Sequence, residues 1–220
     1  MSNPFEYNGG AMIGMKGNGC VAISCDRRLG AQFQTVACNF QKVFKIQDNI
    51  LLGLTGLATD VQTLQIKKNI QILNQFLKSH RQMEFKVNLY RLRENRDMKV
   101  ETFINLISAA LYEKRWGPYF VQPIVIGLED GKTPMVASYD SIGCTSTNEN
   151  FQVGGTAGDG LIGSCESMWR DDLTPEQLED VVAQALLAGA DRDILSGWGG
   201  IVYVITKDKI TVKVLKSKQS

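Results

Sequence analysis

Residues 11–26 read Ala-Met-Ile-Gly-Met-Lys-Gly-Asn-Gly-Cys-Val-Ala-Ile-Ser-Cys-Asp, and this stretch decides how the fold begins. Two apolar runs, 11–16 and 20–25, lie on either side of Gly17-Asn18-Gly19. Glycine and asparagine accept the positive φ angles of tight hairpin turns, so the stretch predicts an antiparallel β-hairpin. The charged residues at 26–28 end the second run. The chain is therefore expected to open on antiparallel strands.

The next segments change from strand to helix patterning. Residues 42–46 and 49–54 form a second pair of short apolar runs, split by a polar Gln-Asp turn. After residue 56, apolar residues recur at helical spacing, which predicts two amphipathic helices. Their apolar stripes are Ile66, Ile70, Leu73 and Leu77 in the first, and Val100, Phe103, Ile104, Ile107 and Leu111 in the second. The polar stretch 78–84 between them predicts a solvated bend.

The second half of the chain repeats the same order of elements. Runs at 121–128, 134–139 and 151–156 predict strands, and two helices follow them. The second helix begins at Thr174-Pro175-Glu176-Gln177, a capping box with proline at the first helical position. Runs at 200–206 and 210–215 predict two final strands. Grouped strands alternating with pairs of helices predict an α+β fold, a four-layer αββα sandwich with two antiparallel sheets between helical layers.

Composition excludes several classes of function. The 220 residues carry a net charge of +1, which argues against a diffuse basic surface for nucleic acid or anionic lipid. Five cysteines without CxxC spacing argue against a disulfide framework and a zinc site, so they are expected to be reduced and mostly buried. His80 is the only histidine, which leaves no material for a His-based triad or metal site. No cofactor is expected.

The ends and apolar runs of the chain indicate where the protein resides. Residues 1–10 lack the charged and apolar regions of a signal peptide. No apolar run approaches the length that spans a bilayer. The protein is therefore expected to be soluble and intracellular.

Several motifs together resemble one family. They are Gly9-Gly10-Ala11, the stretch 19–28 (GCVAISCDRR), 41–44 (QKVF), 53–60 (GLTGLATD) and 191–197 (DRDILSG). In order and spacing they resemble proteasome beta subunits, over almost the whole chain. The resemblance implies the N-terminal nucleophile hydrolase type of the αββα fold. It also implies one domain over residues 1–220, with 1–10 as a short unprocessed extension.

The resemblance also implies where catalytic groups would lie. Active members of the family use an N-terminal threonine, whose hydroxyl attacks the peptide carbonyl while its own α-amine takes the proton. That position falls on Gly10, which has no side chain, so no catalytic residue is expected. Asp26 and Lys42 match the family's catalytic-site acid and lysine. Asp193 and Ser196 match the Asp and Ser of the family's C-terminal motif. Gly158 falls where the family has a further serine. We call Asp26, Lys42, Asp193 and Ser196 the polar frame. Without a nucleophile, its charged pair is expected to survive as a buried ion pair between strands.

Two other functions stay open on the sequence alone. An active hydrolase would need Ser2, exposed by removal of Met1, or a nucleophile at another position. Ser2 lies eight positions before Gly10 and would have to fold back into the site with close tolerance. The other possibility is a free-standing binding module with this fold.

The loop 154–160 resembles a phosphate-binding loop but lacks the Gly-Lys-Ser/Thr ending. A strand-to-helix turn is therefore expected there.

If the chain does not catalyse, its function lies in its surfaces. The resemblance implies a 28-subunit particle with two copies of each alpha and beta subunit, unfolded polypeptide substrates in its chamber, and a location in cytoplasm and nucleus. The turn at 139–144 is expected to reach a neighbour, with Asp140 and Cys144 as candidates to line its substrate pocket. Residues 64–84 contain about fifteen residues more than the resemblance predicts, equivalent to about four helical turns.

Overall fold

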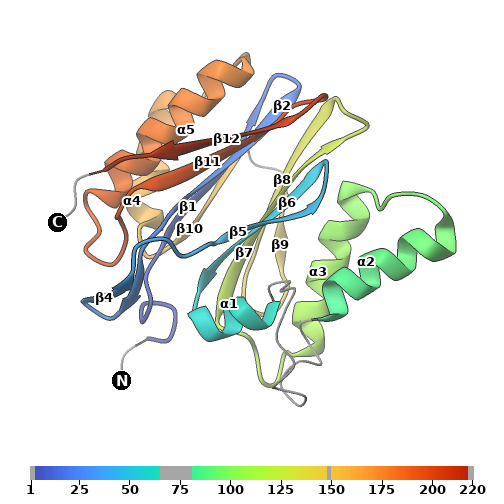
Figure 1. Cartoon of the computed structure of the whole chain (residues 1–220), viewed down its shortest axis with the longest axis horizontal. Helices are drawn as coiled ribbons and strands as arrows, with labels where there is room; N and C mark the ends of the chain where they lie inside the picture. The colour runs from blue at the N-terminus through green and yellow to red at the C-terminus, as the bar shows by residue number, and fades with distance from the viewer. Residues whose placement is uncertain (1–2, 65–80, 148–149, 218–220) are drawn as a thin grey trace.

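Two five-stranded antiparallel sheets stack face to face at the centre of the molecule (Figure 1). The computed structural model describes residues 3–64, 81–147 and 150–217. The first sheet has the order β10-β1-β2-β11-β12, with bounds Phe151–Gly155, Ala11–Gly17, Cys20–Asp26, Gly200–Ile205 and Ile210–Leu215. The second has the order β5-β6-β7-β8-β9, with bounds Val43–Gln47, Ile50–Gly56, Val121–Glu129, Thr133–Tyr139 and Thr145–Ser146.

Helices cover the outer face of each sheet. In Figure 1, α4 (Gly158–Met168) and α5 (Pro175–Ala190) lie on the first sheet. On the second sheet lie α1 (Ala58–Leu64) and α3 (Val100–Glu113), and α2 (Arg81–Glu94) lies beside α3, farther from the strands. The layers therefore run helix, sheet, sheet, helix, which confirms the predicted α+β sandwich. No helix in the described part of the chain is long and apolar enough to cross a bilayer.

Strand β1 illustrates why the sequence produces layers. Successive side chains of a strand point to opposite faces. Ile13 and Met15 accordingly pack with the helices α4 and α5, whereas Met12 packs between the two sheets. Gly14 also faces the second sheet, because a Cβ there would lie 2.9 Å from the Ile124 side chain. A strand buried on both faces needs an almost continuous apolar run, and residues 11–15 provide one.

The local signals in the sequence are confirmed where they were strongest. Gly17 pairs with Cys20 across the predicted two-residue turn, and Gly19 has a φ of 63°. At the start of α5, the Gln177 amide donates to the Thr174 hydroxyl, and the Thr174 amide donates to the Gln177 side chain. This is the complete capping box.

Other elements were predicted wrongly or not at all. Helix α2 begins at Arg81, so the bend predicted over 81–84 is wrong. The residues there, Arg, Gln, Met and Glu, have high helix propensity, and a polar sequence alone does not end a helix. Strands β3 (Leu29–Ala31), β4 (Gln34–Ala37) and β9, and helix α1, are too short to give a periodic signal. The stripe of residues 66–77, His80, and most of the expected insertion at 64–84 lie outside the described residues.

Candidate functional site

Asp26 and Lys42 form a buried ion pair where the first sheet meets β5. Asp26 is the last residue of β2, Lys42 immediately precedes β5, and their side chains are 0% and 4% exposed. The Lys42 Nζ lies 2.5 Å from Asp26 Oδ1, which also accepts a hydrogen bond from the Ala11 amide at 2.9 Å. Asp26 Oδ2 accepts from the Gly197 amide at 3.3 Å. One buried carboxylate thus connects β1, β2, Lys42 and the loop that precedes β11.

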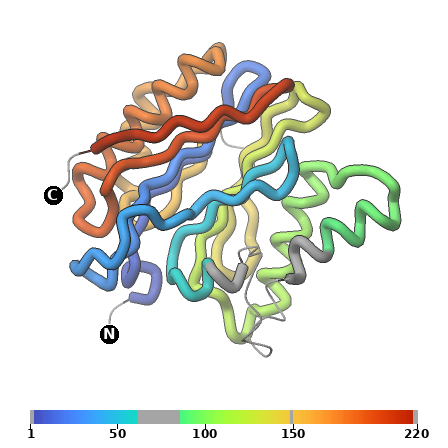
Figure 2. Tube along the Cα trace, in the orientation of Figure 1, coloured from blue at the N-terminus to red at the C-terminus, as the bar shows by residue number. Residues whose placement is uncertain are grey.

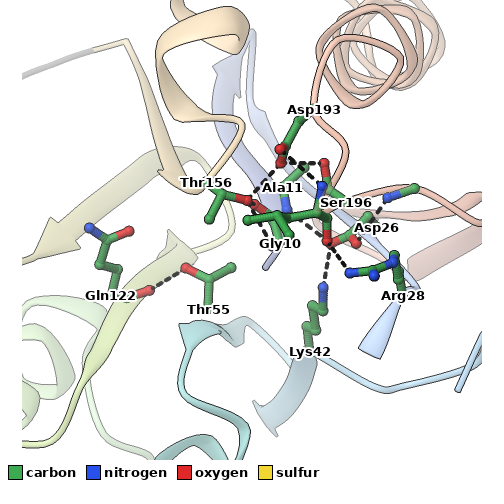
Figure 3. Close-up of polar contacts among 12 residues, drawn as sticks. Gly10, Ala11, Asp26, Arg28, Lys42, Thr55, Gln122, Thr156, Asp193 and Ser196 are labelled. Carbon is green, nitrogen blue, oxygen red and sulfur yellow. Dashed lines mark hydrogen bonds and ion pairs between the residues drawn. The ribbon is translucent and has the colours of Figure 1, made fainter. Parts of the chain in front are cut away.

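Asp193 and Ser196 lie in that same loop and form a second polar group (Figure 3). Asp193 Oδ2 accepts from the Ser196 hydroxyl at 2.8 Å and from the Thr156 hydroxyl at 2.6 Å. Asp193 Oδ1 accepts from the Leu195 amide at 3.1 Å. The aspartate therefore stabilises its own loop and ties it to the segment that joins β10 to α4.

Gly10 lies between these two groups. Its amide donates to the Thr156 Oγ1 at 3.2 Å, so Thr156 links Gly10 to Asp193. A Cβ placed on Gly10 would lie 3.2 Å from the Lys42 Nζ and 3.7 Å from Asp26 Oδ1. A side chain at position 10 would consequently point at the ion pair. With glycine there, position 10 itself supplies no hydroxyl or thiol that could attack a carbonyl.

The segment before Gly10 is packed against the rest of the fold. The Asn8 side chain donates to the Gly30 carbonyl at 2.7 Å and accepts from the Ala58 amide, at the start of α1, at 2.8 Å. Gly9 has a φ of 69°, and a Cβ there would lie 2.1 Å from the Leu195 carbonyl oxygen. The Phe5 ring packs edge-to-face against Phe120 with the centroids 5.7 Å apart. Residues before Gly10 thus contribute contacts of their own.

The structure brings Gly10 and the four residues of the polar frame together, whereas the correspondence of Gly158 to a family serine stays a prediction. Gly158 is the first residue of α4, and a Cβ there would meet nothing within 4 Å. The hydroxyl that contacts both Gly10 and Asp193 comes from Thr156, two residues earlier. Sequence reasoning missed Thr156 because the pairing of Ala11 with Gly155, which brings it to Gly10, is a long-range contact. Its position directly after Gly154-Gly155 was the available signal.

Asp140 and Cys144 lie away from this cluster, in the turn that follows β8. Both are exposed. Asp140 Oδ1 accepts from the amides of Ile142 at 3.0 Å and Cys144 at 2.8 Å, and so holds its own turn closed. The Ser108 hydroxyl on α3 donates to the Gly143 carbonyl at 2.6 Å, which fastens the turn to that helix. The turn is therefore a partly exposed projection, held by hydrogen bonds within itself and to α3.

Most of the cysteines are buried, as expected. Cys20, Cys25 and Cys165 are buried free thiols, as expected, whereas Cys38 and Cys144 are exposed. Burial raises the pKa of Cys25 to about 12, and the neighbouring Asp26 charge acts in the same direction. Because the thiolate is the nucleophilic form, Cys25 does not substitute for the missing group. Among the residues that the structure describes, no three His, Cys, Asp or Glu side chains are placed to hold a metal ion.

Comparisons with known proteins point to one family. A family model described as proteasome subunit matches residues 6–205. A proteasome subunit beta type-3 of Picea mariana is 48% identical over 214 residues, which cover 97% of this chain and 98% of that relative. The beta type-3 subunit of Saccharomyces cerevisiae is 46% identical over 221 residues and is matched along the full length of both chains.

Proposed function

The chain belongs to the proteasome subunit family, and from this premise we infer that it is a structural beta-ring subunit of the 20S core particle. It assembles with other proteasome subunits and does not itself cleave peptide bonds. Three stretches, 7–10 (YNGG), 56–63 (GLATDVQT) and 111–119 (LYEKRWGPY), are typical of the beta type-3 subunit, the name that the relatives above carry.

The single observation that carries the non-catalytic function is the surroundings of Gly10. The lysine and carboxylate that would serve a nucleophile lie beside position 10, and that position has no side chain. Family chemistry needs a hydroxyl and a free α-amine on the same residue. Here the Gly10 nitrogen is a peptide amide that donates to Thr156, and the residues before it are anchored through Asn8.

The mass of the chain in the assembled particle tests this proposal. We expect the chain to keep residues 3–9, because cleavage between Gly9 and Gly10 needs a hydroxyl at position 10. A mature chain that begins at an internal threonine, serine or cysteine would contradict it. Ser2, the nucleophile of the alternative hydrolase, lies outside the described residues. The contacts of Asn8 and Gly9 hold the segment before Gly10 against residues 30, 58 and 195, which disfavours folding of Ser2 back to the position of Gly10.

The finer features of the assembly are part of the proposal. We propose a hetero-oligomeric 28-subunit particle with two copies of each subunit, in which this chain completes a beta ring and walls the chamber where unfolded polypeptides are degraded. The expected location is cytoplasm and nucleus, within ubiquitin-dependent degradation. Native mass spectrometry of particles purified through a tag on this chain would count its copies. A particle with one copy, or a stable free monomer in extracts, would oppose the proposal.

The projection at 139–144 is proposed to line the substrate pocket of a neighbouring subunit. Support comes from its rigidity, since Asp140 and Ser108 hold it, and from the exposure of Cys144. Cys144 and Cys38 are both exposed in the single chain, so an alkylating reagent should label both. In the assembled particle, Cys144 should be labelled much more slowly than in the free chain. Equal labelling of Cys144 in both forms would exclude the contact.

A further inference from the structure

A pocket next to the polar frame contains a buried positive charge that has no acidic partner. The pocket has a volume of about 690 Å³ and is lined by residues of the β3–β4 ribbon and of 190–198. Figure 2 shows the course of the chain through these two segments. Arg28, at its wall, is only 3% exposed. Within the described part of the chain, no carboxylate lies within ion-pair distance of Arg28, whose partners are all neutral.

The Arg28 side chain is held in place by three hydrogen bonds. Its Nε donates to the Thr35 hydroxyl at 3.0 Å, and its terminal nitrogens donate to the carbonyls of Leu195 at 2.8 Å and Gln32 at 3.1 Å. The guanidinium packs over Gly30, where a Cβ would lie 2.1 Å from one terminal nitrogen. A guanidinium has five N–H donors, so the two terminal nitrogens retain capacity for a bidentate carboxylate.

The carboxylates that line the same pocket do not neutralise Arg28. Asp193 accepts from Thr156, Ser196 and the Leu195 amide, and Asp191 is exposed to solvent without an ion pair to Arg28 in the described part of the chain. A buried charge without an ionic partner is costly, and a well-placed carboxylate relieves that cost. The pocket therefore has the chemistry of an anion acceptor.

Two strongly exposed apolar side chains also line the pocket. Phe33, at the tip of the ribbon, is 77% exposed, and Ile194 on the opposite wall is 76% exposed. Strands β3 and β4 pair only with each other among the described strands, and residues 7 and 8 are hydrogen-bonded to the ribbon at Gly30 and Gln32. Apolar side chains around a desolvated charge are the usual composition of a protein interface centre.

From these observations we propose that the pocket between the β3–β4 ribbon and residues 190–198 receives an Asp or Glu side chain of a different, adjacent subunit. Arg28 is its charge partner, and Phe33 and Ile194 close over the stem of the inserted residue. The inference rests on the proposed function, since it assumes assembly into the particle. In this proposal the polar frame has a structural role. Asp26 and Asp193 hold residues 193–197, which form one wall of the pocket.

The first test measures assembly of tagged chains in cells that lack the native one. Phe33→Ser and Ile194→Ser should each slow incorporation into the particle by about tenfold, as for loss of an interface centre. Leu92→Ser on α2 is the matched control, because Leu92 is also 77% exposed, and it should incorporate like the unmodified chain. Pocket variants that incorporate as well as Leu92→Ser would overturn the pocket while leaving the proposed function intact. Failure of the unmodified chain to incorporate would instead defeat the proposed function.

A second test identifies the occupant. A photo-crosslinking phenylalanine analogue at position 33, in the assembled particle, should capture one segment of one other subunit, and that segment should contain an Asp or Glu. Replacing that acid by alanine and Arg28 by Gln should each slow assembly, and the combination should cost no more than the larger single effect. The proposal would be overturned if the two substitutions slowed assembly additively, or if the captured segment contained no Asp or Glu. It would also be overturned if the crosslinker captured only substrate polypeptide or a second copy of this chain.

Discussion

At the scale of single residues, the candidate site is a set of polar contacts around Gly10, which has no side chain. Lys42, Asp26 and Thr156 surround position 10 from three different segments, and each also has a structural partner. The ion pair joins strands, and the Thr156 hydroxyl joins the β10–α4 connection to Asp193. These side chains therefore have structural contacts of their own, so their contribution to stability can be measured by substitution independently of any chemistry.

Gly10→Thr tests whether the surroundings still support chemistry. We expect partial cleavage between residues 9 and 10 in the assembled particle, because the Thr156 hydroxyl is present although residue 158 supplies none. Cleavage should stay incomplete because the new Cβ would lie 3.2 Å from Lys42 Nζ and must displace it slightly, and small misplacements cost large factors in rate. Intact mass measures the cleaved fraction. Gly10→Val, which has the same shape without the hydroxyl, is the control, and cleavage of both variants would show that another protease acts.

The buried ion pair should be expensive to break from one side. Asp26→Asn and Lys42→Met should each lower the free energy of unfolding by about 3–5 kcal/mol, because each leaves a buried group without its partner. The double variant should lose less than the sum of the two, measured by denaturant titration of the recombinant chain. Lys45→Met breaks the exposed pair with Asp48, whose atoms are 2.7 Å apart, and should change stability little. Strict additivity at 26 and 42 would mean that the pair is not coupled.

At the scale of elements, the helices α4 and α5 form a tightly packed layer on the first sheet. Leu161 of α4 and Leu178, Val182 and Leu186 of α5 are buried in one apolar cluster with β1. The helices approach closely at Gly189, where a Cβ would lie 2.2 Å from the Leu161 side chain. Packing, more than helix propensity, therefore decides which residue is tolerated at that crossing.

Two helical glycines separate packing from propensity. Gly189→Ala should destabilise the chain by about 1–3 kcal/mol, because the added methyl forces α4 away from α5. Gly163→Ala, on the exposed face of α4 where a Cβ meets nothing within 4 Å, should stabilise it by about 0.5–1 kcal/mol. Thermal unfolding of the two variants would reveal opposite shifts in Tm. A stabilised Gly189→Ala variant would contradict the close approach of the helices.

At the scale of the whole molecule, the apolar clusters between the four layers bury titratable groups that ionise only at high pH. Burial raises the pKa of Cys25 and of Cys165 to about 12 and that of Cys20 to about 11, from a usual value of 9.0. Burial raises the pKa of Tyr139 as well. In each case the folded chain holds its proton more tightly than the unfolded chain does.

The stability of the chain should consequently fall as pH rises above about 9. Between pH 9.0 and about 12 the unfolded chain loses thiol protons that the folded chain keeps, so ionisation favours unfolding. Below pH 9.0 this contribution to stability is fully present. Denaturant midpoints from neutral to alkaline pH measure the slope, and Cys25→Ala and Cys165→Ala variants should each have a flatter one. An unchanged slope in both variants would show that the buried thiols do not contribute.

Local sequence patterns were enough to predict the layers of the fold, and the resemblance to a known family indicated the residues of the polar frame. Hairpin turns, capping signals and apolar periodicity act between neighbours along the chain, so 11–26 and the start of α5 could be predicted without coordinates. Only the tertiary structure decided that Thr156 completes the cluster around Gly10 and that Arg28 lies in a pocket without an acid. Those contacts join residues far apart in the chain, 146 positions for Gly10 with Thr156 and 167 for Arg28 with Leu195. Such pairs form because stacked sheets bring their loops together, and local patterns carry no information about that geometry.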